Sequence, residues 1–427
     1  MILEASIVLT IIFVTLFVVG IPIAISIALS SLATILLITS GDVAVFTAAQ
    51  KMAASLDSFS LIAVPFFILS GTIMNRGGLA IRLVNLAKLI GGRIPGALAH
   101  TNIIGNMLFG AISGSAIAAS TAVGGTLIPL EEKDGYDKSY SAAVNIASAP
   151  TGMLIPPSSA FIIYSLVSGG TSIAALFIGG YISGIMWGLA VMFVAWIFAK
   201  KNKYPVCVKP NKEEVIQILI EGIPSVVLIL VVIIGIVTGI FTAIEASAVC
   251  VVYCIILSMV FYKTVTVKDM YGIMVETFHM TGVIMFLIAA SSIMSFAMAF
   301  TGLPAAISEG ILSVSENKYV IITIINILLL IIGTFMDIGP AILIFTPIFL
   351  PIALKIGMHP VHFGVIFVYN LCIGTITPPV GTGLFVGAGI AKLKVEEVLK
   401  TLVPYYVAII GVLFIITFFP QIIIAFI

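Results

Sequence analysis

The chain has 427 residues, of which 61% are hydrophobic and 9% are charged, and its mean hydropathy is +1.29. This composition lies far outside the range of soluble domains and predicts a polytopic membrane protein. A net charge of +1 excludes the dense basic face that a nucleic-acid partner requires, and the few scattered cysteines, Cys207, Cys250, Cys254 and Cys372, exclude a disulfide framework.

Three membrane spans are predicted near the N-terminus, at residues 3–19, 22–39 and 58–74, because each has roughly the 17–25 apolar residues that a span needs. An alternative for the first two is one long tilted helix. The N-terminus lacks the basic segment and cleavage site of a signal peptide, so we expect a retained first span. Residues 42–57 and 79–93 are too polar to span, and the second of these has the amphipathic pattern of an interfacial helix.

A re-entrant helical hairpin is predicted over residues 94–131. This apolar segment is interrupted by GAISGSAIAAS at residues 110–120, which leaves two half-length arms around a tip rich in glycine and serine. Such a hairpin would enter and leave the bilayer by the same face. The alternative is a single span with small residues at a helix contact, since Gly110 and Gly114 match the GxxxG motif.

One kind of helix break occurs twice, in NIASAPTGMLIPPSS at residues 145–159 and in NLCIGTITPPVGT at residues 370–382. Each stretch is apolar with one Asn and then breaks into Thr, Gly and a Pro-Pro pair. In lipid, the exposed backbone of a broken helix is tolerated only where it lines an enclosed cavity. A single break is more simply a proline kink, but paired breaks in two halves of a chain point to a transport site. We predict broken spans at 140–167 and 363–391.

A full span is predicted at residues 173–199, with Gly180, Gly184 and Gly188 along one face for close helix packing. A segment with five lysines follows at 200–212. The later elements repeat the earlier order: spans at 222–239, 242–262, 278–300 and 402–426, a polar helix at 264–276, and a second hairpin at 319–354 with its tip at 333–341.

The order of elements predicts an all-α membrane fold made of two inverted repeats, residues 1–199 and 222–427, joined by a cytoplasmic linker at 200–221. Five full spans per half, an odd number, require the second half to be inverted. With the N-terminus outside, 16 of the 19 Lys and Arg fall in cytoplasmic segments, among them Arg93 and Lys209, as the positive-inside rule demands. Lys51, Lys318 and Lys355 remain outside.

The tips and breaks supply hard oxygen ligands suited to Na⁺, and half-helix N-termini that favour an anion. Candidate ligands of a first ion are Ser113, Ser115, Thr151, Gly152 and the carbonyls of Ile155 and Pro157. Candidate ligands of a second ion are Gly333, Asp337, Thr375, Thr377 and Gly381. Candidate substrate-binding residues are Ser113, Gly114, Ser158, Ser159, Gly339, Pro340 and Thr382. Asp337 is the only carboxylate at a tip. Two interpretations are open for it: it binds an ion or a proton, or it caps the helix that follows.

Other polar residues favour structural roles. Glu245 near a membrane face is expected to cap or pair, and His359 and His362 are expected to be solvated rather than to bind metal. Cys250 and Cys254 are interpreted as packed hydrophobes. The chain has no P-loop, no Ser-His-Asp arrangement and no His-Glu-x-x-His motif. We therefore expect no enzyme activity, and energy must come from an ion gradient or a partner.

Four ordered motifs carry a family resemblance: PFFILSG at 65–71, SGSAIAA at 113–119, GMLIPPSS at 152–159 and ITPPVGTGLFV at 376–386. Over essentially its whole length the chain resembles the large membrane subunit of tripartite ATP-independent periplasmic (TRAP) transporters. The resemblance implies a Na⁺ symporter of a bacterial or archaeal inner membrane that works as an elevator. It also implies two partners: a small four-helix membrane subunit, expected as a separate polypeptide, and a soluble periplasmic protein that captures a carboxylate.

The function expected from these features is Na⁺-coupled import of an organic acid, with sialic acid and C4-dicarboxylates as leading substrates. No buried Arg lies near a tip, so discrimination is expected mainly in the soluble partner. One alternative is a stand-alone Na⁺/dicarboxylate or citrate symporter. Another, a proton-conducting subunit of a respiratory complex, predicts buried acids and lysines in mid-helix, and this chain has almost none apart from Asp337.

Overall fold

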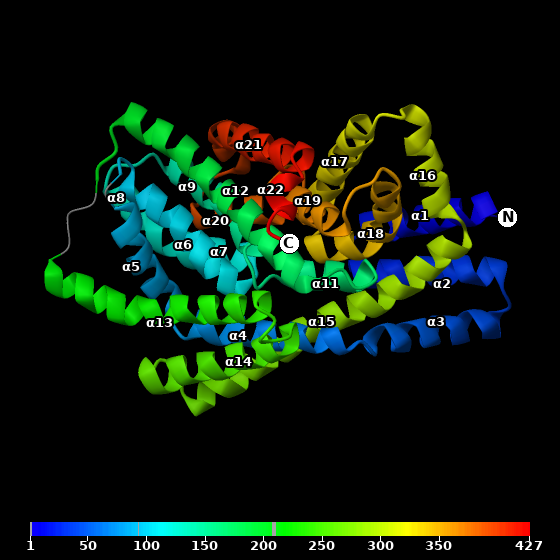
Figure 1. The fold of residues 1–427 in the computed structure, drawn as a ribbon, viewed down its shortest axis with the longest axis horizontal. Helices are drawn as coiled ribbons and strands as arrows, with labels where there is room; N and C mark the ends of the chain where they lie inside the picture. The colour runs from blue at the N-terminus through cyan, green and yellow to red at the C-terminus, as the bar shows by residue number, and fades with distance from the viewer. Residues whose placement is uncertain (1, 93, 207–210) are drawn as a thin grey trace.

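The computed structural model describes residues 2–92, 94–206 and 211–427. Arg93, Cys207 and Lys209, which enter the predictions above, lie outside these ranges. Every regular element in the described ranges is helical, which confirms the all-α prediction (Figure 1). In these ranges eight helices are long and apolar enough to cross a membrane, or nine if one bent pair is counted as a span.

The helices follow one another through short connections. Up to the lysine-rich segment they are α1 (Ile2–Val18), α2 (Ile23–Ile38), α3 (Gly41–Leu56), η1 (Phe59–Ile62), α4 (Ala63–Arg76), α5 (Leu79–Gly91), α6 (Ala97–Ser113), α7 (Ala116–Ala119), η2 (Ser120–Gly124), α8 (Gly125–Lys133), α9 (Lys138–Ser148), α10 (Thr151–Leu154), α11 (Ser159–Val167) and α12 (Ile173–Asn202). After it they are α13 (Lys212–Val237), α14 (Ala243–Ile255), η3 (Ile256–Phe261), α15 (Val267–Phe300), α16 (Leu303–Val314), α17 (Lys318–Phe335), α18 (Ile338–Lys355), α19 (Pro360–Gly374), α20 (Thr382–Ile390), α21 (Val395–Phe418) and α22 (Gln421–Ile424).

The first two predicted spans are separate helices, α1 and α2, which pack against each other. Gly20 between them has φ +89°, a backbone conformation that suits glycine. The alternative of one long tilted helix is therefore wrong. The predicted ends of both helices agree with the observed ends to within one residue.

The chain reverses direction at two helical tips, and the two arms of each reversal pack together. The first tip lies at Gly114, with α6 against α7, η2 and α8, and the second at Asp337, with α17 against α18. Gly114 has φ +61°, which favours glycine at the reversal. Re-entry of each hairpin by the same membrane face stays a prediction, as does the inverted relation of the two halves.

Both predicted helix breaks are present. The first helix is interrupted after Leu154 and resumes at Ser159, with a bend of 47°, and the second is interrupted after Gly374 and resumes at Thr382. Proline lacks the N–H that a continuing helix needs, so each Pro-Pro pair ends regular hydrogen bonding. The peptide bonds Pro156–Pro157 and Pro378–Pro379 are both cis.

The start of α13 differs from the prediction. This helix begins at Lys212 rather than at residue 222, because Asn211 and Glu214 form a reciprocal capping box that starts it early. Much of the predicted linker at 200–221 is therefore helical, at the end of α12 and the start of α13.

The polar helix predicted at 264–276 and the span predicted at 278–300 are one helix, α15. Thr266 and Asp269 cap its start, and nothing between Glu276 and Phe278 breaks helical hydrogen bonding. The polar residues in the first third of α15 lower the local hydropathy but do not end the helix. The sequence prediction contains no helix where the structure has α16. Gly302, the residue before this helix, has a left-handed backbone conformation with φ +64°.

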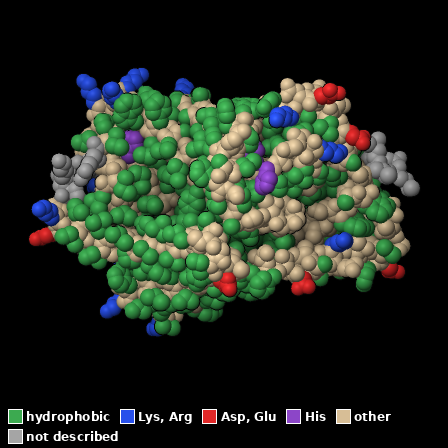
Figure 2. All heavy atoms as spheres, in the orientation of Figure 1, with side chains coloured by type: hydrophobic (Ala, Val, Ile, Leu, Met, Phe, Trp, Pro, Cys, Tyr) green, Lys and Arg blue, Asp and Glu red, His purple; other side chains and the backbone are tan. Residues whose placement is uncertain are grey.

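Charge is distributed unevenly along the molecule. Figure 2 shows basic side chains gathered towards the end where Figure 1 places α8 and the start of α13, whereas acidic side chains predominate towards the other end. This distribution agrees with the positive-inside argument, and the orientation itself stays a prediction.

Candidate functional site

A cavity of about 430 Å³ lies where the two tips and the two breaks meet. One wall contains Gly114 and Ser115 from the first tip, Ser159 after the first break, Asp337 at the second tip and Thr382 after the second break. The facing wall comes from the start of α2 and the middle of α15. Segments distant in sequence thus share one site.

Two glycine contacts bring the hairpins against the broken helices. A Cβ on Gly110 would lie 2.4 Å from the Cα of Gly152, and a Cβ on Gly374 would lie 2.2 Å from the carbonyl carbon of Gly333. No side chain fits at such distances, so α6 meets α10, and α17 meets α19, backbone to backbone. Gly152 and Gly333, predicted as ion ligands, therefore also have a packing role.

A buried amide network fixes the first hairpin to the first broken helix. The Asn106 side chain donates to Asn102 Oδ1 at 2.9 Å, to Asn145 Oδ1 at 3.0 Å and to Ser148 Oγ at 2.8 Å. The Asn145 side chain donates in turn to Ser120 Oγ at 2.8 Å. All five residues are fully buried. These bonds fix the hairpin to the broken helix, although Asn106 Oδ1 itself has no partner among the described residues.

The second half has a smaller network at the corresponding place. Asn370 donates to Asn326 Oδ1 at 2.9 Å, and Asn326 donates to Thr417 Oγ1 at 3.1 Å. Asn145 and Asn370 are the single Asn residues of the two repeated stretches. Their role is to attach each broken helix to its hairpin.

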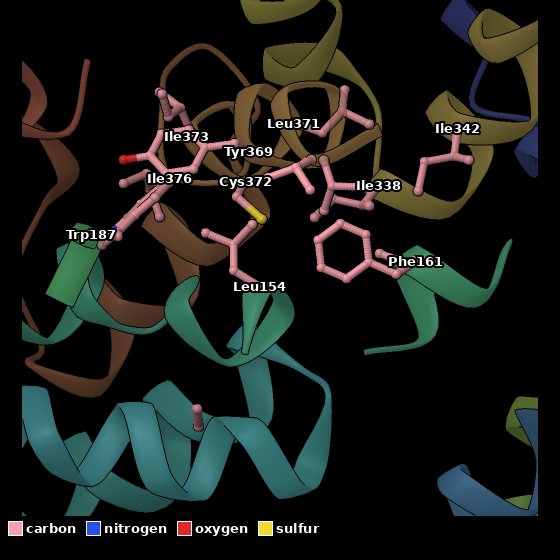
Figure 3. Packing of buried hydrophobic residues seen from close by; sticks show 14 of the residues in the cluster. Leu154, Phe161, Trp187, Ile338, Ile342, Tyr369, Leu371, Cys372, Ile373 and Ile376 are labelled. Atoms are coloured by element: carbon pink, nitrogen blue, oxygen red, sulfur yellow. The ribbon is translucent and has the colours of Figure 1, made fainter. Parts of the chain in front are cut away.

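Apolar packing holds the two breaks together (Figure 3). Leu154 at the first break and Ile376 at the second lie in the same buried cluster, next to Trp187 of α12. The Trp187 and Tyr369 ring centroids are 4.7 Å apart, and Trp187 Nε1 donates to the carbonyl of Ala147 at 2.7 Å. The unwound backbone is therefore supported from behind by a rigid core.

The second tip carries the acidic group of the cavity. Asp337 occupies the position before α18, but its side chain makes no capping hydrogen bond. Its Oδ1 instead accepts a hydrogen bond from Thr382 Oγ1 at 3.2 Å. The carboxylate thus connects the second tip to the second break, and the alternative role as a helix cap is wrong.

The first tip offers hydroxyl and carbonyl oxygens without a carboxylate. Ser115 Oγ accepts a hydrogen bond from the Ala118 amide at 3.3 Å and caps α7. Ser113 Oγ lies 3.4 Å from the Ser115 carbonyl oxygen, to which it donates. The two tips therefore differ in ligand chemistry, and also in backbone, since Gly114 is left-handed whereas Met336 and Asp337 are extended.

The cavity wall includes many of the predicted site residues: Gly114, Ser115, Ser159, Asp337, Gly339, Pro340, Thr375 and Thr382. The others do not line it: Ser113, Thr151, Gly152, Ile155, Pro157, Ser158, Gly333, Thr377 and Gly381. The Thr151 and Thr377 hydroxyls donate to helix carbonyls of Ser148 and Ile373 at 2.6 and 2.7 Å. The ligand roles of all these residues stay predictions.

Sequence reasoning missed the facing wall. It consists of Pro22, Ile23 and Ala24 in one strip and Val283, Ile284 and Leu287 in another. These residues are apolar positions of ordinary spans and carry no motif. Only the structure shows that they line the same cavity as the tips.

Besides α2 and the single-turn helix α7, three helices begin at the cavity: α11, α18 and α20. Their first residues, Ser159, Ile338 and Thr382, all line it. A helix N-terminus carries partial positive charge and unpaired N–H groups, which favour an anion. Together with Asp337, the cavity offers one acidic group for a cation and three helix ends for an anion.

Two polar predictions away from the cavity have different outcomes. Glu245 caps α14 as predicted, with Oε2 accepting from the Thr242 amide at 2.8 Å. His362 is buried rather than solvated, with Nε2 2.8 Å from the Ile416 carbonyl oxygen, so that prediction is wrong. His359 is exposed, and its side chain accepts from the Val361 amide and caps α19, which begins at Pro360.

Cys250, Cys254 and Cys372 are free and buried, which for Cys250 and Cys254 confirms the predicted packing as small hydrophobes. In the described ranges no three or more His, Cys, Asp or Glu side chains gather as a metal site. The cavity instead offers Asp337, hydroxyls and backbone oxygens, a donor set that fits a weakly held Na⁺ better than a transition metal.

Comparison with known proteins agrees with this geometry. Residues 10–422 match the family described as "Tripartite ATP-independent periplasmic transporter, DctM component". The chain is 39% identical over 406 residues to the isethionate TRAP transporter permease protein DctMQ of Oleidesulfovibrio alaskensis, covering 95% of this chain and 64% of that protein. It is 34% identical over 402 residues to the sialic acid TRAP transporter large permease protein SiaM of Vibrio cholerae, covering 94% and 93%.

A solved structure supports the fold. The YdaH transporter of Alcanivorax borkumensis, described as having an unusual topology, matches with a TM-score of 0.53 at 12% identity, covering 90% of this chain and 89% of that one. Named relatives are transporter permeases and not enzymes. In the described ranges this chain itself has eight or nine segments that could cross a membrane. The chain therefore belongs to the DctM family of TRAP transporter large permeases and is a multi-pass protein of the inner membrane.

Proposed function

We propose that this chain imports an organic acid together with Na⁺, using the cavity between the tips and the breaks as the site where both bind. Transport would follow an elevator mechanism, in which the two hairpins and two broken helices slide as a body against α2, α15 and their neighbours. Family membership implies, in general, a substrate-binding protein and a small membrane subunit as partners. A separate four-helix subunit and a periplasmic binding protein are the specific partners proposed.

The observation that carries this proposal is the composition of the cavity wall. Both tips and both breaks contribute to one wall, and two helices that belong to neither hairpin nor broken helix form the other. A site at the boundary of two helix groups is exposed alternately when one group moves past the other. Asp337 and the nearby hydroxyls suit the cation, and the three helix N-termini suit the anion.

The substrate class proposed is an organic acid. Relatives are named for isethionate and for sialic acid, which are both acids. In the described ranges no Lys or Arg lines this cavity. The groups of the cavity that suit an anion are hydroxyls and backbone amides, which are neutral and discriminate weakly among acids. This agrees with selection of the substrate by the soluble partner. Sialic acid, C4-dicarboxylates and isethionate are the substrates to test first.

The test is uptake of each labelled acid into proteoliposomes that contain this chain and its small subunit, with the Na⁺ gradient and the binding protein varied independently. The expected result is uptake that requires both. Uptake without the binding protein would contradict the tripartite mechanism and indicate a stand-alone symporter. Uptake that is indifferent to Na⁺ would contradict the coupling.

A further inference from the structure

A second cavity, of about 570 Å³, lies beside the first and differs from it in charge. Its wall comes from α3, the residue that precedes η1, the end of α11, α15 and α18. The polar members of the wall are one lysine and a set of serines: Lys51, Ser55, Ser58, Ser291, Ser292 and Ser295. No carboxylate of the described residues contributes to it.

The positive charge of Lys51 is uncompensated. Its Nζ lies 5.1 Å from the ring centroid of Phe296, another wall residue, where the aromatic face attracts a cation. In the part of the chain that the structure describes, Lys51 forms no ion pair. Asp57, the nearest acid along the chain, is exposed and is not part of the wall. An anion that enters this cavity therefore meets an ammonium group without a competing carboxylate.

The serines add hydrogen-bond donors around this charge. Ser291 is only 2% exposed, and its hydroxyl has no hydrogen-bond partner among the described residues. A buried, unpartnered hydroxyl is costly unless something binds it. Ser292 Oγ donates to the Lys51 carbonyl at 2.9 Å and so ties α3 to α15. An ammonium group with several hydroxyl donors is the chemistry that recognises a carboxylate or another oxyanion.

The same three helices connect the two cavities. On α15, Leu287 lines the first cavity and Ile288 the second. On α11 the corresponding residues are Ile163 and Leu166, and on α18 they are Pro340 and Leu343. Three residues of a helix span about 4.5 Å, so the cavities lie roughly one helical turn apart. The predicted topology places Lys51 on the outer side.

We propose that this second cavity is an outer vestibule that binds the anionic group of the incoming organic acid, with Lys51 and the hydroxyls of Ser58, Ser291 and Ser295 as its ligands. The acid would then pass along α11, α15 and α18 to the first cavity, where the helix N-termini replace the ammonium group. A vestibule of this kind gives a function to one of the few basic residues on the outer side. This inference rests on the proposed function.

The test measures the electrostatics of the vestibule without requiring transport. Ser295→Cys is labelled in the full chain with a negatively charged sulfonate thiol reagent and with a neutral reagent of similar size, and the labelling of the unmodified chain is subtracted. Adding Lys51→Gln should slow the sulfonate reagent about fivefold and leave the neutral reagent unchanged, since one unit charge at a few ångströms has about this effect in a partly aqueous site. Lys355→Gln, another exposed outer lysine that lines neither cavity, is the matched control and should change neither rate.

A second arm identifies the ligand class. Succinate should protect Ser295→Cys from the neutral reagent when Lys51 is present, and the uncharged succinamide should not. Equal protection by both compounds, or an unchanged sulfonate rate in Lys51→Gln, would overturn the proposal. If the labelling results hold but uptake does not require Na⁺, the vestibule stands and the coupling mechanism fails.

Discussion

The two helix breaks share a backbone design and differ in chemistry. Each break crosses its hairpin at a glycine pair, Gly152 with Gly110 and Gly374 with Gly333, and each is anchored by one Asn. Only the second tip supplies a carboxylate, whereas only the first is anchored by an extended amide network. We infer that the backbone contacts shape the site and that the side chains at each tip determine which ion or group binds there.

The largest effect is expected where the two halves are alike. Gly110→Val and Gly374→Val should each abolish folding, because the new Cβ would lie 2.4 Å and 2.2 Å, respectively, from a backbone atom of the facing helix. Overpacking of this kind costs about 3 kcal/mol or more. Gly125→Val and Gly389→Val are matched helical controls, since a Cβ at either position meets nothing within 4 Å. The yield of monodisperse protein by size-exclusion chromatography measures the outcome. A normal yield for either crossing variant would show that the hairpin and the break separate in the folded protein.

A smaller, unequal effect is expected from the anchoring residues. Asn145→Leu should lower stability by about 2–3 kcal/mol, because it leaves the amide of Asn106 and the hydroxyl of Ser120 with fewer partners in a buried site. Asn370→Leu should cost less, about 1–2 kcal/mol, because its side chain pairs with one other side chain, that of Asn326. Thermal unfolding in detergent compares the two. Equal losses would contradict the difference between the networks.

Asp337→Asn should raise the Na⁺ concentration for half-maximal uptake about tenfold, which corresponds to about 1.4 kcal/mol of binding free energy. The variant keeps the shape of the side chain and its contact with Thr382 but removes the negative charge. Asp57→Asn, at an exposed acid outside the cavity, is the control. Unchanged Na⁺ dependence in Asp337→Asn would remove this residue from the ion site.

The smallest effect is expected from single hydroxyls. Ser115→Ala and Thr375→Ala should each raise the half-maximal Na⁺ concentration about threefold and leave folding intact, because a neutral oxygen contributes less than a charge. Thr334→Ala, near the second tip but outside the cavity wall, should behave as wild type. Wild-type Na⁺ dependence in both cavity variants would show that carboxylate and backbone oxygens bind the ion without these hydroxyls.

The sequence was sufficient to predict what local chemistry determines. Pro-Pro pairs end helices wherever they occur, and Gly114 suits a reversal, so both breaks and the first tip were predictable. Runs of apolar residues likewise gave most helix positions. A capping box is also local, and Asn211 with Glu214 shows that closer attention to caps would have placed the start of α13 correctly.

Properties that depend on three-dimensional packing were not predictable. The amino-acid sequence around Leu287 does not distinguish a residue of a cavity wall from one that faces lipid. The glycines Gly152 and Gly333 suggested ligands, and only the structure shows that backbone of the facing helix excludes a side chain at Gly152 and leaves little room for one at Gly333. Asp337 was compatible with a cap or an ion site, and its bond to Thr382 depends on the second break folding back to the tip.

The most direct test of the account is equilibrium binding of radioactive Na⁺ to the purified chain, for wild type and Asp337→Asn. We predict two bound Na⁺ per wild-type chain, one at each tip. Asp337→Asn should bind one Na⁺ with wild-type affinity, because the first tip keeps its own oxygens, and the other about tenfold more weakly. Loss of all Na⁺ binding in the variant, or no loss at all, would contradict the assignment of one ion to each half.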